Sequence, residues 1–227
     1  MLINATPGLA ALLAFTMATV ALSPTTANAA QSHHTGHHSF SDAAEWAKKF
    51  DDPKRDAWQK PHEVIQALKL GPNAVIADIG AGTGYFAMRF AHMTPGGRVL
   101  AVDTEPDMVK YLGERARREG LKNVVALAAE PGNPKLTEKA DLVFLVDVYH
   151  HIDSREKYFR QLQQSLKPDG RVAVIDFRMD SPEGPPPAAR IAPDRVKKEM
   201  LAAGYVLLEE HAFLPNQYFL IFRPATR

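Results

Sequence analysis

The chain has 227 residues, a formal net charge of +1 at pH 7 and no cysteine. That length suits one domain with an extension, and a hydrophobic content of 45% is enough for a full core. The balanced charge gives no argument for a nucleic-acid partner or an anionic membrane. The absence of thiols excludes disulfides, thiolate nucleophiles and cysteine metal sites.

The N-terminus has the pattern of an export signal. Residues 1–30 contain no Lys, Arg, Asp or Glu, and Leu9–Leu22 is a nearly unbroken apolar run. Such a run is short for a bilayer span but suits the core of a secretory signal. Because Ala27-Asn28-Ala29 offers a small-x-small cleavage pattern, we expect a signal peptide over residues 1–29 and a periplasmic or secreted protein with no stable membrane span. No basic residue precedes the run, so an uncleaved anchor or a cytoplasmic chain is the alternative.

A histidine-rich stretch follows the expected cleavage site. The segment His33-His-Thr-Gly-His-His38 holds four of the nine histidines. Imidazoles at this density can bind metal loosely, but a polar, disordered linker over residues 30–40 is the favoured interpretation. The folded domain is then expected over residues 41–227.

From residue 41 onward, helical and strand patterns alternate with short connections. Helices are expected over Ala43–Phe50, Pro61–Leu68, Tyr85–Met93, Pro106–Gly120, Ser154–Leu166 and Pro193–Ala203. Strands are expected over Val75–Ile79, Arg98–Val102, Asn123–Ala128, Asp141–Val146, Arg171–Asp176, Tyr205–His211 and Gln217–Phe222. Lys167–Gly170 is expected to turn into the fifth strand, and the proline-rich segment Ser181–Pro187 to form an irregular loop over a site.

This order of elements predicts an α/β fold with a doubly wound, mostly parallel seven-stranded sheet. The first five strands are separated by crossover helices, and the last two form an antiparallel C-terminal hairpin. Sheets of this kind bind ligands at the carboxyl ends of their strands. The polar residues at the ends of the first four strands are therefore the candidate functional residues.

A glycine-rich turn follows the first strand, in the segment Asp78-Ile-Gly-Ala-Gly-Thr-Gly84. Alternating glycines allow a ligand to touch bare backbone, and the start of the next helix favours an anionic group. A nicotinamide dinucleotide fold requires G-x-G-x-x-G, and Tyr85 stands where the third glycine of that pattern belongs. The spacing therefore disfavours an oxidoreductase.

The pattern D-x-G-x-G-x-G resembles the S-adenosylmethionine (SAM) loop of class I methyltransferases, and the resemblance extends from about Pro61 to Arg223. Val102–Met108 looks like the family's second motif, and Asp147-Val-Tyr-His-His151 looks like the end of the fourth strand in several small-molecule members. The resemblance implies a Rossmann-like class I methyltransferase fold, SAM as cofactor and methyl transfer to a small-molecule acceptor.

Site residues follow from the same resemblance. The residues expected to contact the cofactor are Asp78, Gly80, Ala81, Gly82, Gly84, Asp103, Thr104, Glu130 and Asp147. Asp103 is expected to accept both ribose hydroxyls. Asp147 either contacts the methionine ammonium or orients a histidine. Glu130 departs from the family pattern, because Glu-Pro-Gly replaces the common Gly-Asp pair.

The catalytic candidates are His150, His151 and Tyr149, and no metal ligand set is expected. An imidazole near neutral pKa suits proton removal from a hydroxyl acceptor, although one of two adjacent histidines is expected to face the core. Tyr149 is expected to pack by the sulfonium or to position the acceptor. Methyl transfer is an in-line displacement, so alignment alone is the alternative mechanism.

Trp58, which precedes the fold, either closes over the cofactor or acceptor, or anchors its helix to the core. Asp176 and His211 are expected to be structural. Two other functions remain open: a protein that binds SAM or another nucleoside without turnover and, less favoured, a nicotinamide-dependent oxidoreductase.

Overall fold

A seven-stranded sheet, in the order β3-β2-β1-β4-β5-β7-β6, carries the elements that position the site. The structure is a computed structural model that describes residues 1–2, 42–133 and 136–225. The expected signal peptide and histidine-rich linker lie outside these residues, apart from the first two positions, so both stay predictions.

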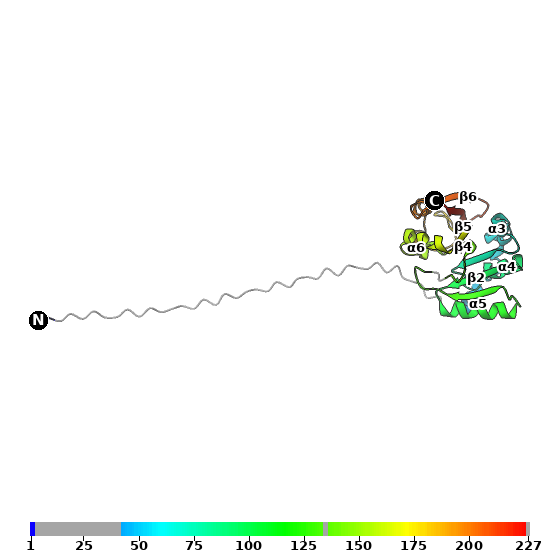
Figure 1. Ribbon diagram of the computed structural model, residues 1–227, viewed down its shortest axis with the longest axis horizontal. Coiled ribbons are helices and arrows are strands. Elements are labelled where there is room, and N and C mark those ends of the chain that lie inside the picture. The colour runs from blue at the N-terminus through cyan, green and yellow to red at the C-terminus, as the bar shows by residue number, and fades with distance from the viewer. Residues whose placement is uncertain (3–41, 134–135, 226–227) are drawn as a thin grey trace. The chain divides into compact units, whose positions relative to one another are not determined.

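The elements alternate along the chain as shown in Figure 1. The strands are β1 Val75–Ile79, β2 Arg98–Asp103, β3 Val124–Ala128, β4 Ala140–Val146, β5 Leu166–Phe177, β6 Tyr205–His211 and β7 Gln217–Pro224. The helices are α1 Ala43–Phe50, α2 Arg55–Gln59, α3 Pro61–Leu68, α4 Tyr85–Met93, α5 Pro106–Arg118, α6 Arg155–Leu162 and α7 Pro193–Ala202. Three short 3₁₀ turns are η1 Tyr149–His151, η2 Gln163–Ser165 and η3 Pro187–Ala189.

Strand directions confirm the predicted fold class. Strands β1 to β5 are parallel to their neighbours, β7 pairs antiparallel with β5, and β6 pairs antiparallel with β7. The second strand of the C-terminal hairpin thus inserts next to β5, and only β7 runs against the rest. In that pairing Asp176 on β5 lies opposite Tyr218 on β7.

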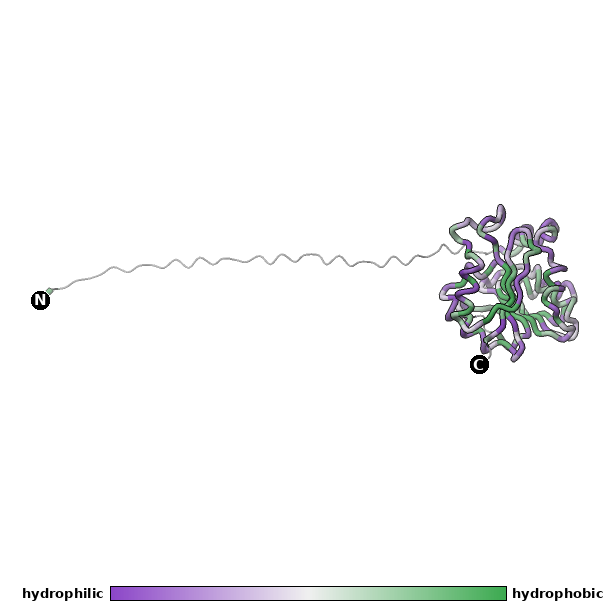
Figure 2. Tube along the Cα trace, turned by 90° about the horizontal axis from the view of Figure 1, so that it is seen from above, coloured by the Kyte–Doolittle hydropathy of each residue, from purple (hydrophilic) through white to green (hydrophobic). Residues whose placement is uncertain are grey.

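Helices cover both faces of the sheet. One hydrophobic cluster joins α3, α4 and α5 to the sheet, and a second joins α6 and α7 to the residues that alternate with the first set. Figure 2 shows the hydrophobic segments gathered in the interior of the domain and hydrophilic segments outside them. This alternation with period two is what a sheet buried on both faces requires.

Local signals explain most boundaries. The Asp42 side chain accepts the Glu45 amide at 3.2 Å and caps α1, and proline occupies the first turn of α3, α5 and α7. Helix α2 was not predicted. The expected helix to Leu166 ends at Leu162, because Leu166 pairs with Ala140 and begins β5 before the expected turn, with a register irregularity before Arg171 pairs.

Within residues 42–133 and 136–225, no helix combines the length and apolar character that a bilayer crossing requires.

Candidate functional site

Four carboxylates stand at one edge of the sheet. Asp78 ends β1, Asp103 ends β2, Asp147 follows β4 and Asp176 lies at the end of β5. Asp78, Asp103 and Asp176 are 4%, 9% and 1% exposed. Burial of so many acidic groups is costly unless cations or hydrogen-bond donors compensate them. The donors and cations that already contact each carboxylate therefore indicate which of them has capacity left for a ligand.

The glycine loop is held by its own backbone. Gly80, Gly82 and Gly84 all adopt positive φ. The amides of Gly80 and Ala81 donate to the Val102 carbonyl, that of Gly82 to the Asp103 carboxylate, and that of Gly84 to the Ala81 carbonyl. These four amides donate within the protein, so the loop does not offer them to an anionic ligand. A Cβ at Gly80 would lie 2.3 Å from the Val148 side chain, so glycine is required there.

Asp103 fixes the loop and still has acceptor capacity. Its Oδ2 accepts the Gly82 amide at 2.8 Å, and its Oδ1 accepts the Glu105 amide at 3.0 Å. Burial raises the pKa of Asp103, and the amides of Glu105, Gly82 and Thr104 partly offset the effect. A carboxylate has about four lone-pair sites, so Asp103 keeps acceptor capacity beyond these amides. That capacity fits a ribose diol, and Thr104 is exposed beside it.

Asp78 ends β1, and its carboxylate lies near the Ala87 amide of α4. Burial raises the pKa of Asp78 to about 7, although the positive charge of Arg55 opposes the shift. The carboxylate is therefore placed where a further cation would stabilise its ionised form.

Asp147 belongs to a hydrogen-bond network of side chains that are far apart in the sequence. Its backbone has φ of 59°, and its Oδ1 accepts the Gln217 side-chain amide at 2.6 Å. Gln217 in turn accepts from Gln59 at 2.7 Å, and Gln59 accepts from Arg55 at 3.3 Å and 3.1 Å. Burial and the nearby charge of Asp176 raise the pKa of Asp147 to about 7.

His150 and Asp176 form a buried dyad. The His150 Nδ1 lies 2.8 Å from Asp176 Oδ2 and 3.0 Å from Oδ1, and the His150 amide donates to the same carboxylate. Burial lowers the pKa of His150, but the hydrogen bond and charge of Asp176 outweigh that effect and raise it. Because Nδ1 faces Asp176, Nε2 is the nitrogen that can take a proton. Asp176 therefore orients a catalytic candidate, a role the sequence did not reveal.

The other two catalytic candidates lie differently. The His151 side chain is exposed, with its ring centroid 4.1 Å from that of His150. Tyr149 is fully buried, its ring stacks on Phe159, and its hydroxyl donates to Glu199 at 2.8 Å. The expectation that Tyr149 positions the acceptor does not fit this placement, because both its ring and its hydroxyl are committed to the packing of α6 and α7.

Residues around the strand ends complete the picture. Glu130 is exposed, and its backbone pairs with Asn133. The Trp58 ring lies 5.9 Å from Phe177, so α2 reaches the end of β5 as a lid or anchor would. His211 packs between two aromatic rings, as a structural residue does.

A buried arginine organises the loop after β5. Arg190 is 9% exposed, and its guanidinium donates to backbone carbonyls throughout the loop, namely those of Arg178, Met179, Ser181, Glu183 and Pro185. The loop expected over residues 181–187 is thus irregular but ordered. Sequence reasoning missed Arg190, Asp176 and Arg55. Arg55 lies close in sequence to Trp58, for which a role at the site was considered.

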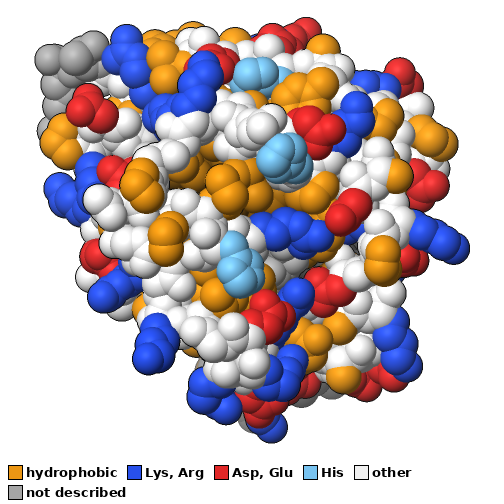
Figure 3. Space-filling view, turned by 90° about the vertical axis from the view of Figure 1, so that its right-hand side faces the viewer, with side chains coloured by type: hydrophobic (Ala, Val, Ile, Leu, Met, Phe, Trp, Pro, Cys, Tyr) orange, Lys and Arg blue, Asp and Glu red, His pale blue; other side chains and the backbone are white. Residues whose placement is uncertain are grey.

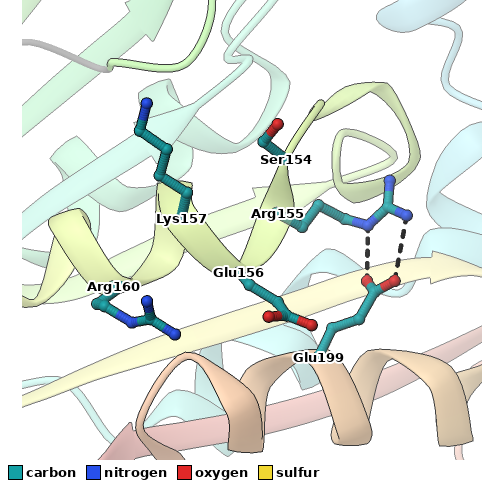
Figure 4. Close-up of a pocket in the computed structure, with 6 residues that line it drawn as sticks. All are labelled: Ser154, Arg155, Glu156, Lys157, Arg160 and Glu199. Carbon is teal, nitrogen blue, oxygen red and sulfur yellow. Dashed lines mark hydrogen bonds and ion pairs between the residues drawn. The ribbon is translucent and has the colours of Figure 1, made fainter.

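The surface offers a further depression of about 400 Å³ at α6 and α7 (Figure 4). In that view Arg155 faces Glu199 and Lys157 points away from this pair. Burial would raise the pKa of Glu199, but hydrogen bonds from Arg155, Tyr149 and Arg195 lower it to about 2. The depression is lined by an ion-pair network and by no residue of the glycine loop, so we assign it a structural role.

Charge is mixed on the visible surface. Figure 3 shows one face on which Lys, Arg, Asp and Glu side chains are interspersed around recessed hydrophobic ones. In the described ranges 42–133 and 136–225, no group of three His, Asp or Glu side chains is arranged to hold a metal ion.

Comparisons with known proteins agree with this geometry. A profile of the family described as "Methyltransferase domain" matches residues 70–211. The chain is similar to the protein-L-isoaspartate O-methyltransferase of Aeropyrum pernix, at 31% identity over 49% of this chain and 42% of that protein. This chain thus spans less than half of that curated relative. It is also similar to a solved SAM-dependent methyltransferase from Aquifex aeolicus, with a TM-score of 0.73 and 26% identity over 80% of this chain and 97% of that one.

A second similar structure limits what the fold implies. The [4+2]-cyclase SpnF has a TM-score of 0.64 and 15% identity over 75% of this chain and 82% of that one. That likeness concerns the fold alone, and function has to be argued from the site.

Proposed function

This chain belongs to the family of methyltransferase domains, whose cofactor is SAM, and we propose that it transfers a methyl group to a small-molecule acceptor. We further propose that the acceptor carries a hydroxyl whose proton His150 removes. The observation that carries this finer proposal is the His150–Asp176 dyad, which lies at the same sheet edge as the other three carboxylates.

For cofactor binding, the proposal assigns roles to residues at the ends of the strands. Asp103 would accept the ribose hydroxyls with the lone pairs that Gly82 and Glu105 leave unused. Asp78 and Asp147 would provide negative charge for a cationic ligand, because Asp78 is buried, Asp147 is half-buried, and the pKa of each carboxyl is raised to about 7. SAM supplies an electrophilic methyl group on a sulfonium.

For the acceptor, the proposal assigns proton transfer to the His150–Asp176 dyad. His150 Nε2 would take the hydroxyl proton as the acceptor oxygen receives the methyl group of SAM, leaving the cofactor as a neutral sulfide. Asp176 holds Nδ1 protonated and stabilises the imidazolium that forms, as in other acid-oriented histidine bases. A raised His150 pKa makes it a stronger base, used at a pH where it is neutral.

The test is release of S-adenosylhomocysteine (SAH) from SAM by the purified full-length chain with a panel of phenols, alcohols, carboxylic acids and amines. We expect turnover with hydroxyl acceptors. His150→Ala should lower kcat by about 10²–10⁴-fold while SAM still binds. His151→Ala is the matched control, because that ring is exposed and adjacent, and it should retain most activity. Full turnover in His150→Ala and in the double variant would leave alignment as the mechanism.

The same experiment separates the alternative functions. SAM and SAH binding without SAH release from any acceptor would indicate a binding protein. Binding of NAD(H) with no SAM binding would indicate an oxidoreductase, against the family assignment.

A further inference from the structure

Arg55 is a cation at the site with no acidic partner in the described part of the chain. Its guanidinium donates three hydrogen bonds, two to the Gln59 side-chain oxygen and one, at 3.0 Å, to the Phe50 carbonyl. A guanidinium has five N–H donors, so two have no acceptor among residues 42–133 and 136–225. Burial lowers the pKa of Arg55, and the charge of Asp147 opposes this shift. A partly buried cation in this state favours an anion.

Arg55 lies close to the start of α4 and to two of the carboxylates at the strand ends. Its guanidinium carbon lies 4.0 Å from the centroid of the Tyr85 ring, and Tyr85 opens α4 directly after Gly84. Its charge also acts on Asp78 and Asp147 without contacting either in an ion pair. A cation without an ion pair and two carboxylates that form no ion pair with it therefore lie near one another, as a receptor for an α-amino acid zwitterion requires.

Four amides of the glycine loop are not available to an anionic group of the cofactor. The amides at positions 80, 81, 82 and 84 already donate to acceptors in the protein. The methionine end of SAM carries an ammonium and a carboxylate. The ammonium finds negative charge at Asp78 and Asp147, whereas the carboxylate finds no donor at those four amides.

We propose that Arg55 binds the α-carboxylate of the methionine end of the cofactor. The proposal rests on the SAM dependence proposed above and adds a residue from outside the sheet. It also links two events, because α2 carries Trp58 as well, whose ring meets Phe177 at the end of β5. Cofactor binding would thereby hold α2 in the position in which Trp58 contacts Phe177, close to Asp176 of the proposed catalytic dyad.

The experiment compares ligands that differ in that carboxylate alone. SAM, SAH and decarboxylated SAM are titrated calorimetrically into the full-length chain and into Arg55→Met. The wild type should prefer SAM over decarboxylated SAM by about 10–100-fold, the size of a charge-assisted hydrogen-bonded pair. In Arg55→Met most of this preference should vanish, through weaker binding of SAM and SAH and unchanged binding of decarboxylated SAM.

Arg89→Met is the matched control. Arg89 also lies over the Tyr85 ring, at 3.9 Å, but pairs with Asp56 at 3.0 Å, so this variant should keep the preference for SAM. Arg55→Gln, which keeps a polar side chain but no charge, is the second variant and should lose the preference if Arg55→Met does not fold.

Two outcomes would overturn the assignment of Arg55. One is equal weakening of SAM and decarboxylated SAM, which would mean that Arg55 only holds α2 in place. The other is an unchanged preference for SAM in a folded variant. A wild-type chain that binds neither SAM nor SAH would instead overturn the proposed function, and this inference with it.

Discussion

The two halves of the sheet edge are held together differently. In the cofactor half, formed by the ends of β1 and β2 and the glycine loop, acidic side chains bind backbone amides nearby in sequence. Asp103 accepts amides 21 residues before it and two residues after it. In the acceptor half, formed by the ends of β4 and β5 with η1 and β7, side chains bind other side chains. Gln217 there joins Asp147, 70 residues away, to Gln59, 158 residues away.

This difference has a physical consequence. A backbone amide is present whatever residue occupies the position, so a carboxylate that fixes the loop depends on few sequence choices. A network of amides, imidazole and carboxylates needs every member, because a buried polar group without a partner costs about 1–3 kcal/mol. The cofactor half should therefore tolerate most neighbouring substitutions, while the acceptor half should respond to single changes at a distance.

The contact between the halves gives the largest expected effect. Gly80→Ala places a Cβ 2.3 Å from the Val148 side chain in the acceptor half, at a φ of 68°. Left-handed strain and overpacking together should lower the free energy of unfolding by about 2–5 kcal/mol. Denaturant unfolding measures this change.

Gly120→Ala is the matched control for Gly80→Ala. Gly120 has a φ of 71° but no atom within 4 Å of its added Cβ, so only the backbone strain remains and the loss should be about 1–2 kcal/mol. Equal losses in the two variants would mean that the Val148 side chain yields freely and that the halves are not packed against each other.

Asp103→Ala tests the cofactor half itself. It removes the acceptor of the Gly82 amide and the proposed acceptor of the ribose hydroxyls, so SAM affinity should fall by roughly 2–3 kcal/mol, about 30–150-fold. Asp107→Ala, an exposed acid on the following helix, should leave affinity unchanged. Wild-type affinity in a folded Asp103→Ala protein would remove Asp103 from the cofactor site.

A double-mutant cycle sharpens the view of the acceptor half. Gln59→Leu or Gln217→Leu leaves one buried amide without its partner, and each should lower the free energy of unfolding by about 1–3 kcal/mol. The double variant should lose less than the two losses added, since neither amide is then stranded. Strict additivity would show that the two side chains do not interact.

The fold and the cofactor half could be predicted from the sequence because their signals are local. Strand β1 and helix α4 match the predicted bounds, since Asp78, the glycines and the apolar runs all lie within one βαβ unit. Ala43–Phe50 was equally predictable from the Asp42 cap. Hydrophobic period, glycine placement and proline at first turns suffice for such elements.

The acceptor half could not be predicted in the same way. Nothing near Asp176 in the sequence indicates that β5 brings it to His150, and nothing near Arg55 reveals its unpaired charge. Tyr149 was a catalytic candidate as part of the Asp147–His151 segment, yet it lies in a 3₁₀ turn with its ring stacked on Phe159 of α6 and its hydroxyl bound to Glu199 of α7. Side-chain direction within one turn is a tertiary property.

The smallest expected effect is a dependence of SAM affinity on pH, which tests whether the carboxylates of both halves act on the same ligand. Burial raises the pKa of Asp78 and of Asp147 to about 7, where Asp78 faces Arg55 and Asp103, and Asp147 faces Asp176, Arg55 and His150. Raised carboxyl pKa values mean that the ligand-free protein holds protons which the unfolded chain releases. Its free energy of unfolding should therefore fall as pH rises from about 4 to about 7.

A cationic ligand favours the ionised carboxylates, so SAM affinity should change in the opposite direction and rise with pH. Between pH 6 and pH 8 the gain should be about tenfold for one carboxylate that titrates near 7 and is ionised in the complex. Calorimetric titration across this range measures the gain. Asp78→Asn should reduce it if the cofactor half contributes, and Asp147→Asn if the acceptor half does. A SAM affinity that does not change with pH in the wild type would mean that neither Asp78 nor Asp147 contacts the positive charge of SAM. Asp103 would then be the one carboxylate of these three that remains assigned to the cofactor.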